Sequence, residues 1–326
     1  FDKVLSVEEY ARWCFKHSLV EFCTAVKGSA LCHLLNKPDC EAVFYFDPDI
    51  AIFDNLEQLT NHFMDYSILL TPHLTDIEKT YSAVWDNEIS ILKHGIYNLG
   101  FVGVKNDTNG HKFAKWWKDR LDLYCYDDIP NGVFTDQSWC DMVPAVFAGV
   151  KVLRDPQYNV ATWNLTHRHV DGSDLEHLYI NNDYKLCFYH FSGFDSGAQL
   201  HMLNKYAKDM PKLFLLRDWY INECKQLDNP RFSLRKWQFN YYNDGTEITR
   251  EQRVLYRMDV DLTAKFPNPF ADMSYLTWYN ASILNKQVEN NTQVGARELH
   301  LILNSTSWKI TKPLRAIGRL ARKLTC

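Results

Sequence analysis

The chain has 326 residues, a formal net charge of −4 at pH 7 and 46% apolar residues. This length allows one large α/β domain with an appendage, and the slightly acidic balance gives no basis for nucleic-acid binding. No apolar run reaches the roughly 18 residues that a membrane-spanning helix needs. The nine cysteines form no C-x-x-C pair, which is typical of reduced thiols in a cytoplasmic protein.

Strands and helices alternate along the first two hundred residues, a pattern that predicts an α/β fold with a mainly parallel sheet and helices on both faces. The expected strands cover 42–46, 67–70, 96–104, 151–153 and 185–190, and the expected helices cover 20–35, 55–63, 76–93, 110–126 and 136–147. Beyond these lie helical pieces, aromatic-rich loops and a basic tail. We therefore expect a main domain over 1–205, a helical and irregular, aromatic-rich extension over 206–284, and a linker with a basic tail over 285–326.

The segment Ala42–Phe46 is apolar without alternation, as expected for a strand buried on both faces of a parallel sheet. Asp47 and Asp49 follow it, and in extended backbone residues two apart project to the same side. Two carboxylates at the carboxyl end of a buried strand suit Mn²⁺ or Mg²⁺. The alternative is a turn in which Asp-Pro-Asp only ends the strand.

Four further motifs place polar side chains at ends of expected elements. The motif Asn98-Leu99-Gly100 lies on an expected strand with two interior glycines, which mark places where another group approaches the backbone closely. The motifs are Asn98-Leu99-Gly100, Asp136-Gln137, the loop Tyr158–Asn164 with Trp163, and His190 followed by Gly193.

Each motif also has a purely structural interpretation. Asp136 can cap a helix, Asn98 can fill a turn or bulge, and His190 can be a hydrogen-bonded core histidine. Their joint occurrence in this order favours a shared functional site over these separate interpretations.

Together the motifs resemble those of nucleotide-sugar glycosyltransferases of the GT-A fold, especially retaining enzymes of family 8, related to glycogenin and bacterial lipooligosaccharide galactosyltransferases. The phrases "YFDPDIAIFD", "YNLGFVGV", "DQSW", "NVATWNL" and "YHFSGFD" are similar to those of glycosyltransferase modules in bacterial polysaccharide-building enzymes. The resemblance covers residues 7–205. It implies a GT-A-like domain that transfers a hexose from a nucleotide sugar, UDP-linked by preference, to a glycan or lipid-linked acceptor in surface polysaccharide synthesis, at the inner face of the membrane.

The resemblance also implies a role for each matched residue. Asp47, Asp49 and His190 would hold the Mn²⁺ or Mg²⁺ ion, and Asp136 would be the carboxylate that acts on the sugar. Asn98 and Gln137 would orient sugar hydroxyls, Gly100 and Gly193 would line the donor site, and Trp163 would contact the acceptor, with plain packing as its alternative.

Two departures from the family pattern matter. Family members begin with a strand that cradles the nucleotide base, whereas the first residues here match the helix before Ala25-Val26-Lys27. The chain is therefore expected either to be N-terminally truncated or to have a different base-binding half. A Lys-Pro-Trp after H-x-x-G is replaced by Asp195-Ser196-Gly197, which leaves Lys27 as the candidate for diphosphate binding, with a solvated surface lysine as the alternative.

Other functions stay open from the sequence. A truncated transferase-like scaffold or glycan-binding module fits the same motifs, whereas a metal-dependent phosphodiesterase is disfavoured because two-metal sites need more clustered ligands. In the tail, residues 308–324 combine basic residues with apolar residues at helical spacing. This pattern predicts either peripheral membrane contact or a linker to a further glycosyltransferase module.

Overall fold

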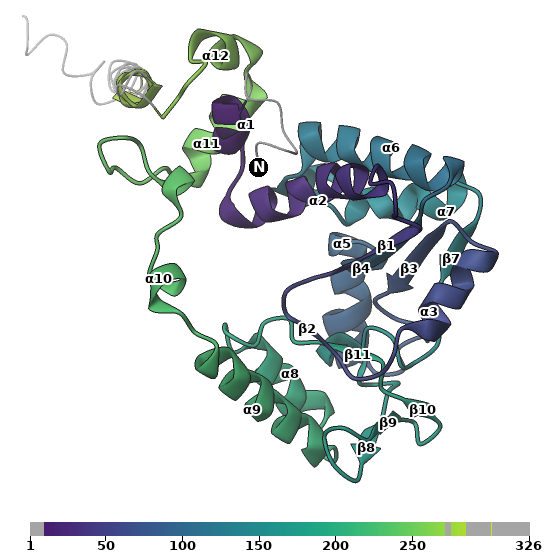
Figure 1. Ribbon diagram of the computed structural model, residues 1–326. Helices are drawn as coiled ribbons and strands as arrows, with labels where there is room; N and C mark the ends of the chain where they lie inside the picture. Colours follow the sequence, from purple (N-terminus) through teal and green to yellow (C-terminus); the bar gives the residue numbers. More distant parts are fainter. Residues whose placement is uncertain (1–9, 271–274, 285–300, 302–326) are drawn as a thin grey trace, which may run out of the picture. The chain divides into compact units, whose positions relative to one another are not determined.

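The computed structural model describes residues 10–270, 275–284 and 301 and has a mixed α/β fold (Figure 1). The chain forms two compact units, divided between Asn240 and Tyr241. The expected boundary at residue 205 does not coincide with this division. Helices α8 (Ala198–Tyr206) and α9 (Pro211–Gln226) belong to the first unit, where their buried apolar side chains share a hydrophobic cluster with residues of the preceding strands.

The expected strands of the first unit occur in the expected order, with further short strands between them, and the expected helices over 76–93 and 136–147 are divided into shorter helical pieces. Its strands are β1 (Ala42–Phe46), β2 (Ile50–Ile52), β3 (Ile68–Pro72), β4 (Tyr97–Lys105), β5 (Asp127–Asp128), β6 (Val133–Phe134), β7 (Val150–Val152), β8 (Val170–Gly172), β9 (Leu178–Ile180), β10 (Tyr184–Lys185) and β11 (Phe188–His190). Its other helices are α1 (Tyr10–Lys16), α2 (Leu19–Leu35), α3 (Glu57–Asn61), α4 (Tyr81–Ala83), the π-helical turn η3 (Val84–Glu88), α5 (Ile89–His94), α6 (Thr108–Tyr124), α7 (Val143–Val146) and α10 (Pro230–Ser233), with short 3-10 turns between them.

The central sheet has four strands in the order β1-β4-β3-β7. Strand β4 runs antiparallel to both β1 and β3, and only β3 and β7 pair in parallel. The expectation of a mainly parallel sheet is therefore wrong for the described strands. The reason lies in residues 73–96, which leave the end of β3 and enter β4 at the same end of the neighbouring strand. There the His73 amide donates to the Ile96 carbonyl at 3.0 Å.

Strand β1 is half-buried and lies at an edge of this sheet, so it is not buried on both faces as expected. Its apolar character comes from aromatic packing instead. The Phe44 ring stacks on Phe63 at 5.2 Å, and the Phe46 ring lies 5.2 Å from that of Phe101. Strand β3 is fully buried, as predicted.

Helices α2 and α6 lie side by side and contact β1 and β4, respectively (Figure 1). Their close crossing depends on Gly28, because a Cβ atom there would lie 2.7 Å from the Cα of Lys118. Ser18 and Glu21 form a capping box that begins α2. This helix carries Lys27, so the crossing fixes that side chain against the sheet.

The second unit includes α11 (Arg250–Met258) and α12 (Val260–Lys265), and residues 275–284 are also helical. Tyr275 packs its ring against Tyr256 and Phe266 within this unit. The predicted linker and basic tail over 285–326 lie outside the described residues except for residue 301. Among the helices that the structure describes, none combines the length and the apolar character needed to cross a membrane.

Candidate metal centre

The pairing of the strands brings separate motifs to one edge of the sheet. Phe46 at the end of β1 faces Phe101 in the middle of β4, so Asp47 lies beside the Asn98–Gly100 segment near the beginning of this strand. Its amide donates to the Gly100 carbonyl at 2.7 Å. Strand β11 pairs with β2 so that His190 faces Ile50, next to Asp49. The antiparallel course of β4, which the sequence did not predict, is what places Asn98 at this edge.

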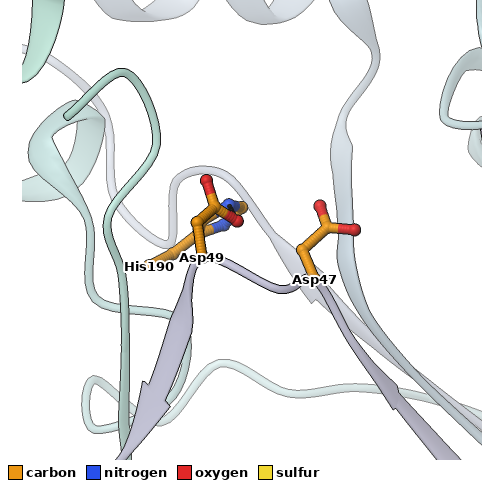
Figure 2. A group of neighbouring side chains, drawn as sticks. All are labelled: Asp47, Asp49 and His190. Carbon is orange, nitrogen blue, oxygen red and sulfur yellow. Dashed lines mark ion pairs between the residues drawn. The ribbon is translucent and has the colours of Figure 1, made fainter. Parts of the chain in front are cut away.

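Asp47, Asp49 and His190 form a cluster that could hold a metal ion (Figure 2). Their ligand atoms lie within 4.8 Å of one another, and no other group of three such residues is found in the part of the chain that the structure describes. The carboxylates are half-buried and the imidazole is buried. His190 Nε2 lies 3.1 Å from Asp49 Oδ1. Burial alone would raise the pKa of Asp49, but the hydrogen bond and charge of His190, a backbone hydrogen bond and the charge of Lys27 together outweigh burial and lower it.

Gly100 leaves the space that the His190 imidazole occupies. A Cβ atom at position 100 would lie 2.5 Å from His190 Cε1 and 2.8 Å from Asn98 Oδ1. Any larger residue would therefore push the imidazole away from the aspartates. This confirms the prediction that an interior glycine of β4 marks a close approach of another group to the strand.

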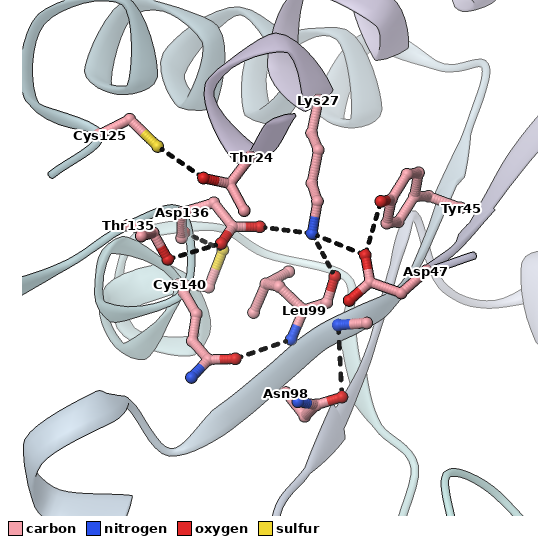
Figure 3. Close-up of polar contacts among 12 residues, drawn as sticks. Thr24, Lys27, Tyr45, Asp47, Asn98, Leu99, Cys125, Thr135, Asp136 and Cys140 are labelled. Carbon is pink, nitrogen blue, oxygen red and sulfur yellow. Dashed lines mark hydrogen bonds and ion pairs between the residues drawn. The ribbon is translucent and has the colours of Figure 1, made fainter. Parts of the chain in front are cut away.

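Lys27 lies at the centre of a buried polar cluster on the other side of Asp47 (Figure 3). Its Nζ is 3.1 Å from Asp47 Oδ1 and 2.9 Å from Asp136 Oδ2, and it donates to the Leu99 carbonyl at 3.0 Å. Burial disfavours its charge, but the two carboxylates outweigh burial and raise the pKa of Lys27. The Tyr45 ring faces the ammonium group at 4.6 Å, and the Tyr45 hydroxyl donates to Asp47 at 2.6 Å.

These contacts bear on the expected role of Lys27. Its ammonium group donates to one carbonyl and forms ion pairs with two carboxylates, so contact with a diphosphate would compete with these partners. The alternative of a solvated surface lysine is wrong, because the residue is only 6% exposed. Lys27 links helix α2 to Asp47, which follows β1, and to Asp136.

Asp136 is 3% exposed, and burial raises its pKa even though Lys27 counteracts the shift. It does not cap a helix: the following 3-10 turn begins after Gln137, with no side-chain cap. The preceding residue, Thr135, has φ of 44°, a left-handed conformation that is uncommon for threonine. The Trp117 indole donates to the Asp136 carbonyl at 3.1 Å, which helps to hold this backbone in place.

The two amides expected to bind the sugar are largely engaged within the protein. Gln137 accepts from the Leu99 amide at 3.3 Å and donates to the His94 carbonyl at 2.9 Å. Asn98 Oδ1 has three donors around it, among them His190 Nδ1 at 3.1 Å and the Gly100 amide at 3.3 Å. Both amides therefore support the backbone and other side chains of the site.

All predicted site residues except Gly193 line one cleft of about 380 Å³. Gly193 lies just outside its lining and adopts φ of 70°, which favours glycine, and its neighbour Ser192 does line the cleft. Trp163 presents its ring edge-on to His190 at 5.3 Å between centroids. The cleft residues are Val20, Thr24, Lys27, Asp47, Asp49, His73, Asp86, Asn87, Ser90, Ile91, His94, Asn98, Leu99, Gly100, Phe134, Thr135, Asp136, Gln137, Trp163, His190 and Ser192.

Three residues of the site were not singled out from the sequence. Tyr45 precedes Asp47 by two positions on the same strand, a spacing that could have indicated it. His73 follows β3 directly and lies in the cleft. Asn159 belongs to the loop that was recognised as a motif, yet no signal distinguished it from its neighbours.

Comparison with known proteins identifies one similar chain. The "Uncharacterized protein YfnF" of Bacillus subtilis (strain 168) is 29% identical over 180 residues, which cover 53% of this chain and 57% of that protein. The match thus spans less than two thirds of the length of its relative. No protein-family model and no solved structure matches the chain.

Proposed function

We propose that the chain is a metal-dependent glycosyltransferase that moves a hexose from a nucleotide sugar, a UDP sugar by preference, to a glycan or lipid-linked acceptor with retention of configuration. One observation carries this proposal. Residues from five separate motifs, predicted from the resemblance to GT-A transferases, line a single cleft around a potential metal centre. The cleft lies within the size range of small-molecule sites.

The donor set of the cluster fits a hard divalent ion. Two carboxylates and one imidazole suit Mn²⁺ or Mg²⁺, and three protein ligands leave coordination positions open for phosphate oxygens. When bound, such an ion would neutralise the charge that develops on the leaving diphosphate. Asp47, Asp49 and His190 would hold it.

The other cleft residues would then position the sugar and act on it. Asp136 is the motif-matched carboxylate for the reacting face, and its ion pair with Lys27 fixes its orientation and favours its charged form. Gly100 and Trp163 would shape the donor and acceptor sides of the cleft. Lys27 would act by holding Asp136 and Asp47 at a fixed spacing through its ion pairs with both.

A turnover assay tests this function. The full chain is incubated with Mn²⁺ and a panel of UDP-hexoses, with and without saccharide acceptors, and UDP release is measured. We expect release from at least one donor, loss of release with EDTA, and a loss of orders of magnitude in Asp136→Asn with Mn²⁺ binding preserved. Saturable glycan binding without UDP release from any donor would support a non-catalytic glycan-binding module instead.

Location and partners follow from the same proposal. A transferase that extends a lipid-linked saccharide would work in the cytoplasm at the inner face of the membrane, alongside further glycosyltransferase modules. Liposome pelleting of the full chain and of a chain ending at Ser307 tests this, because membrane contact through 308–324 predicts that only the full chain sediments with anionic vesicles at low salt.

A further inference from the structure

Two histidines and one asparagine form a connected set next to the metal cluster. Asn98 Oδ1 lies 3.1 Å from His190 Nδ1, and Asn98 Nδ2 lies 3.3 Å from His73 Nε2. His73 Nδ1 in turn lies 3.1 Å from the Ile96 carbonyl. All three side chains are less than 9% exposed, so these contacts are largely shielded from water.

The Ile96 carbonyl fixes the protonation of His73. A carbonyl oxygen only accepts, so His73 Nδ1 must carry a proton. Burial, together with nearby histidines, lowers the pKa of His73 to about 4, so the ring is neutral at pH 7 and its Nε2 is a bare acceptor. The atom of Asn98 that faces His73 Nε2 must therefore be a donor, which is the amide nitrogen.

A second contact fixes the same orientation of Asn98 independently. The Gly100 backbone amide only donates, and it lies 3.3 Å from the other terminal atom of the Asn98 side chain. That atom must be the oxygen. Asn159 Nδ2 also points at it, at 3.1 Å. If the Asn98 amide were flipped, its NH₂ group would face the donors of Gly100 and Asn159. Its oxygen would then face the bare Nε2 of His73, so both sides would be mismatched.

We propose that Asn98, oriented by His73 and by the Gly100 amide, is a positioning residue that keeps the Nδ1 proton on His190 and thereby reserves Nε2 for the cation between His190 and Asp49. Because Asn98 Oδ1 accepts, its 3.1 Å contact with His190 Nδ1 places a proton on Nδ1. Nε2 lies 3.1 Å from Asp49 Oδ1, and a metal ion that binds at Nε2 would replace the hydrogen bond between these two atoms. Partners of this kind orient ligating imidazoles in metal sites and raise their basicity.

This inference rests on the proposed role of His190 as a metal ligand, but its test separates the two. Long-range proton–nitrogen NMR of the ¹⁵N-labelled full chain reports the protonation of each imidazole nitrogen, and the His190→Gln variant identifies the His190 signals among the twelve histidines. We expect a protonated Nδ1 on His190 in the metal-free chain and with saturating Zn²⁺ as a diamagnetic probe. A bare His190 Nδ1 in the metal-free chain would overturn the inference whatever the metal does.

Substitutions of Asn98 test the positioning role itself. Asn98→Ala removes the acceptor, so a form with a bare Nδ1 and a proton on Nε2 should become populated, and Mn²⁺ affinity should fall about 10- to 100-fold. Asn98→Asp keeps an acceptor toward His190 and should keep the protonated Nδ1. Asn106→Ala is the matched control, because the Asn106 side chain is also hydrogen-bonded within the protein, in its case to backbone carbonyls, but lies just beyond the far end of β4.

The outcomes are distinct. An unchanged His190 Nδ1 signal in Asn98→Ala, or an equal loss of Mn²⁺ affinity in Asn106→Ala, would refute the positioning role. If wild type shows the expected protonation but binds no Mn²⁺, the inference about Asn98 stands and the proposed metal chemistry fails. The wild-type measurement needs only the His190→Gln variant for assignment, so an Asn98 variant that does not fold leaves this part of the test intact.

Discussion

Replacing Gly100 by alanine should remove His190 from the metal cluster. The new Cβ atom would lie 2.5 Å from His190 Cε1 and 2.8 Å from His190 Nδ1, whereas ordinary van der Waals contact begins at 3.4 Å. The ring must therefore move by about 1 Å to restore a normal contact distance. Metal–ligand distances tolerate deviations of only about 0.2 Å, so this shift takes Nε2 out of coordination range.

The expected cost appears in two quantities. Mn²⁺ affinity, measured by calorimetric titration, should fall by about 100-fold, the upper end of effects seen when a ligand's support is lost. The free energy of unfolding should fall by about 1–3 kcal/mol, as for overpacking of a well-packed site. A strand glycine without such contact would instead gain about 0.5–1 kcal/mol on replacement by alanine, so the sign of the change is informative.

Gly103→Ala is the matched control on the same strand. Its Cβ atom would lie 3.0 Å from the Phe44 ring and 3.2 Å from Leu69 Cβ, away from the cleft. We expect a loss of stability with unchanged Mn²⁺ affinity. If Gly100→Ala binds Mn²⁺ as wild type does, or if both variants lose affinity equally, the reasoning about Gly100 is refuted.

Two further predictions concern buried charge. Lys27→Met leaves the buried Asp136 without its cation and should lower the free energy of unfolding, measured in urea, by roughly 3–5 kcal/mol. The double variant Lys27→Met/Asp136→Asn should regain part of this loss. A loss below about 1 kcal/mol in Lys27→Met would contradict the buried pair. The pKa of His73 is lowered from 6.5 to about 4 in the folded chain, so between these pH values the unfolded chain binds a proton that the folded chain does not. The neutral His73 therefore contributes stability that is present above pH 6.5 and is lost as the pH falls toward 4. Between pH 7 and pH 4 the wild type should lose about 3 kcal/mol more than His73→Gln, and parallel pH curves for the two proteins would refute this.

The sequence predicted the order of the elements and the residues that gather at the cleft better than the arrangement of the sheet. Alternating strands and helices do not reveal at which edge the chain re-enters the sheet, so the direction of β4 could not be read from the pattern. Asp47, Asp49 and His190 could be predicted because each follows or ends a strand.

The roles of the amides and of Lys27 were less accessible from the sequence. Lys27 has the residue type expected for a phosphate contact, and only the positions of Asp136 and Leu99 show that its ammonium group already has partners within the protein. His73 and Asn159 carry no signal in a single sequence, because their importance depends on contacts made across 25 and 61 positions of the chain with Asn98.

The central claim is that Asp47, Asp49 and His190 bind a divalent cation, and titration of Mn²⁺ into the full chain by calorimetry, with and without UDP, tests it most directly. Asp174→Asn is the control, because Asp174 also pairs with a histidine, at 2.8 Å, but on the exposed surface. We predict saturable binding of about one ion per chain, weakened more than roughly 10-fold in Asp47→Asn and in Asp49→Asn and unchanged in Asp174→Asn. Equal affinity in wild type and in both site variants would contradict the account.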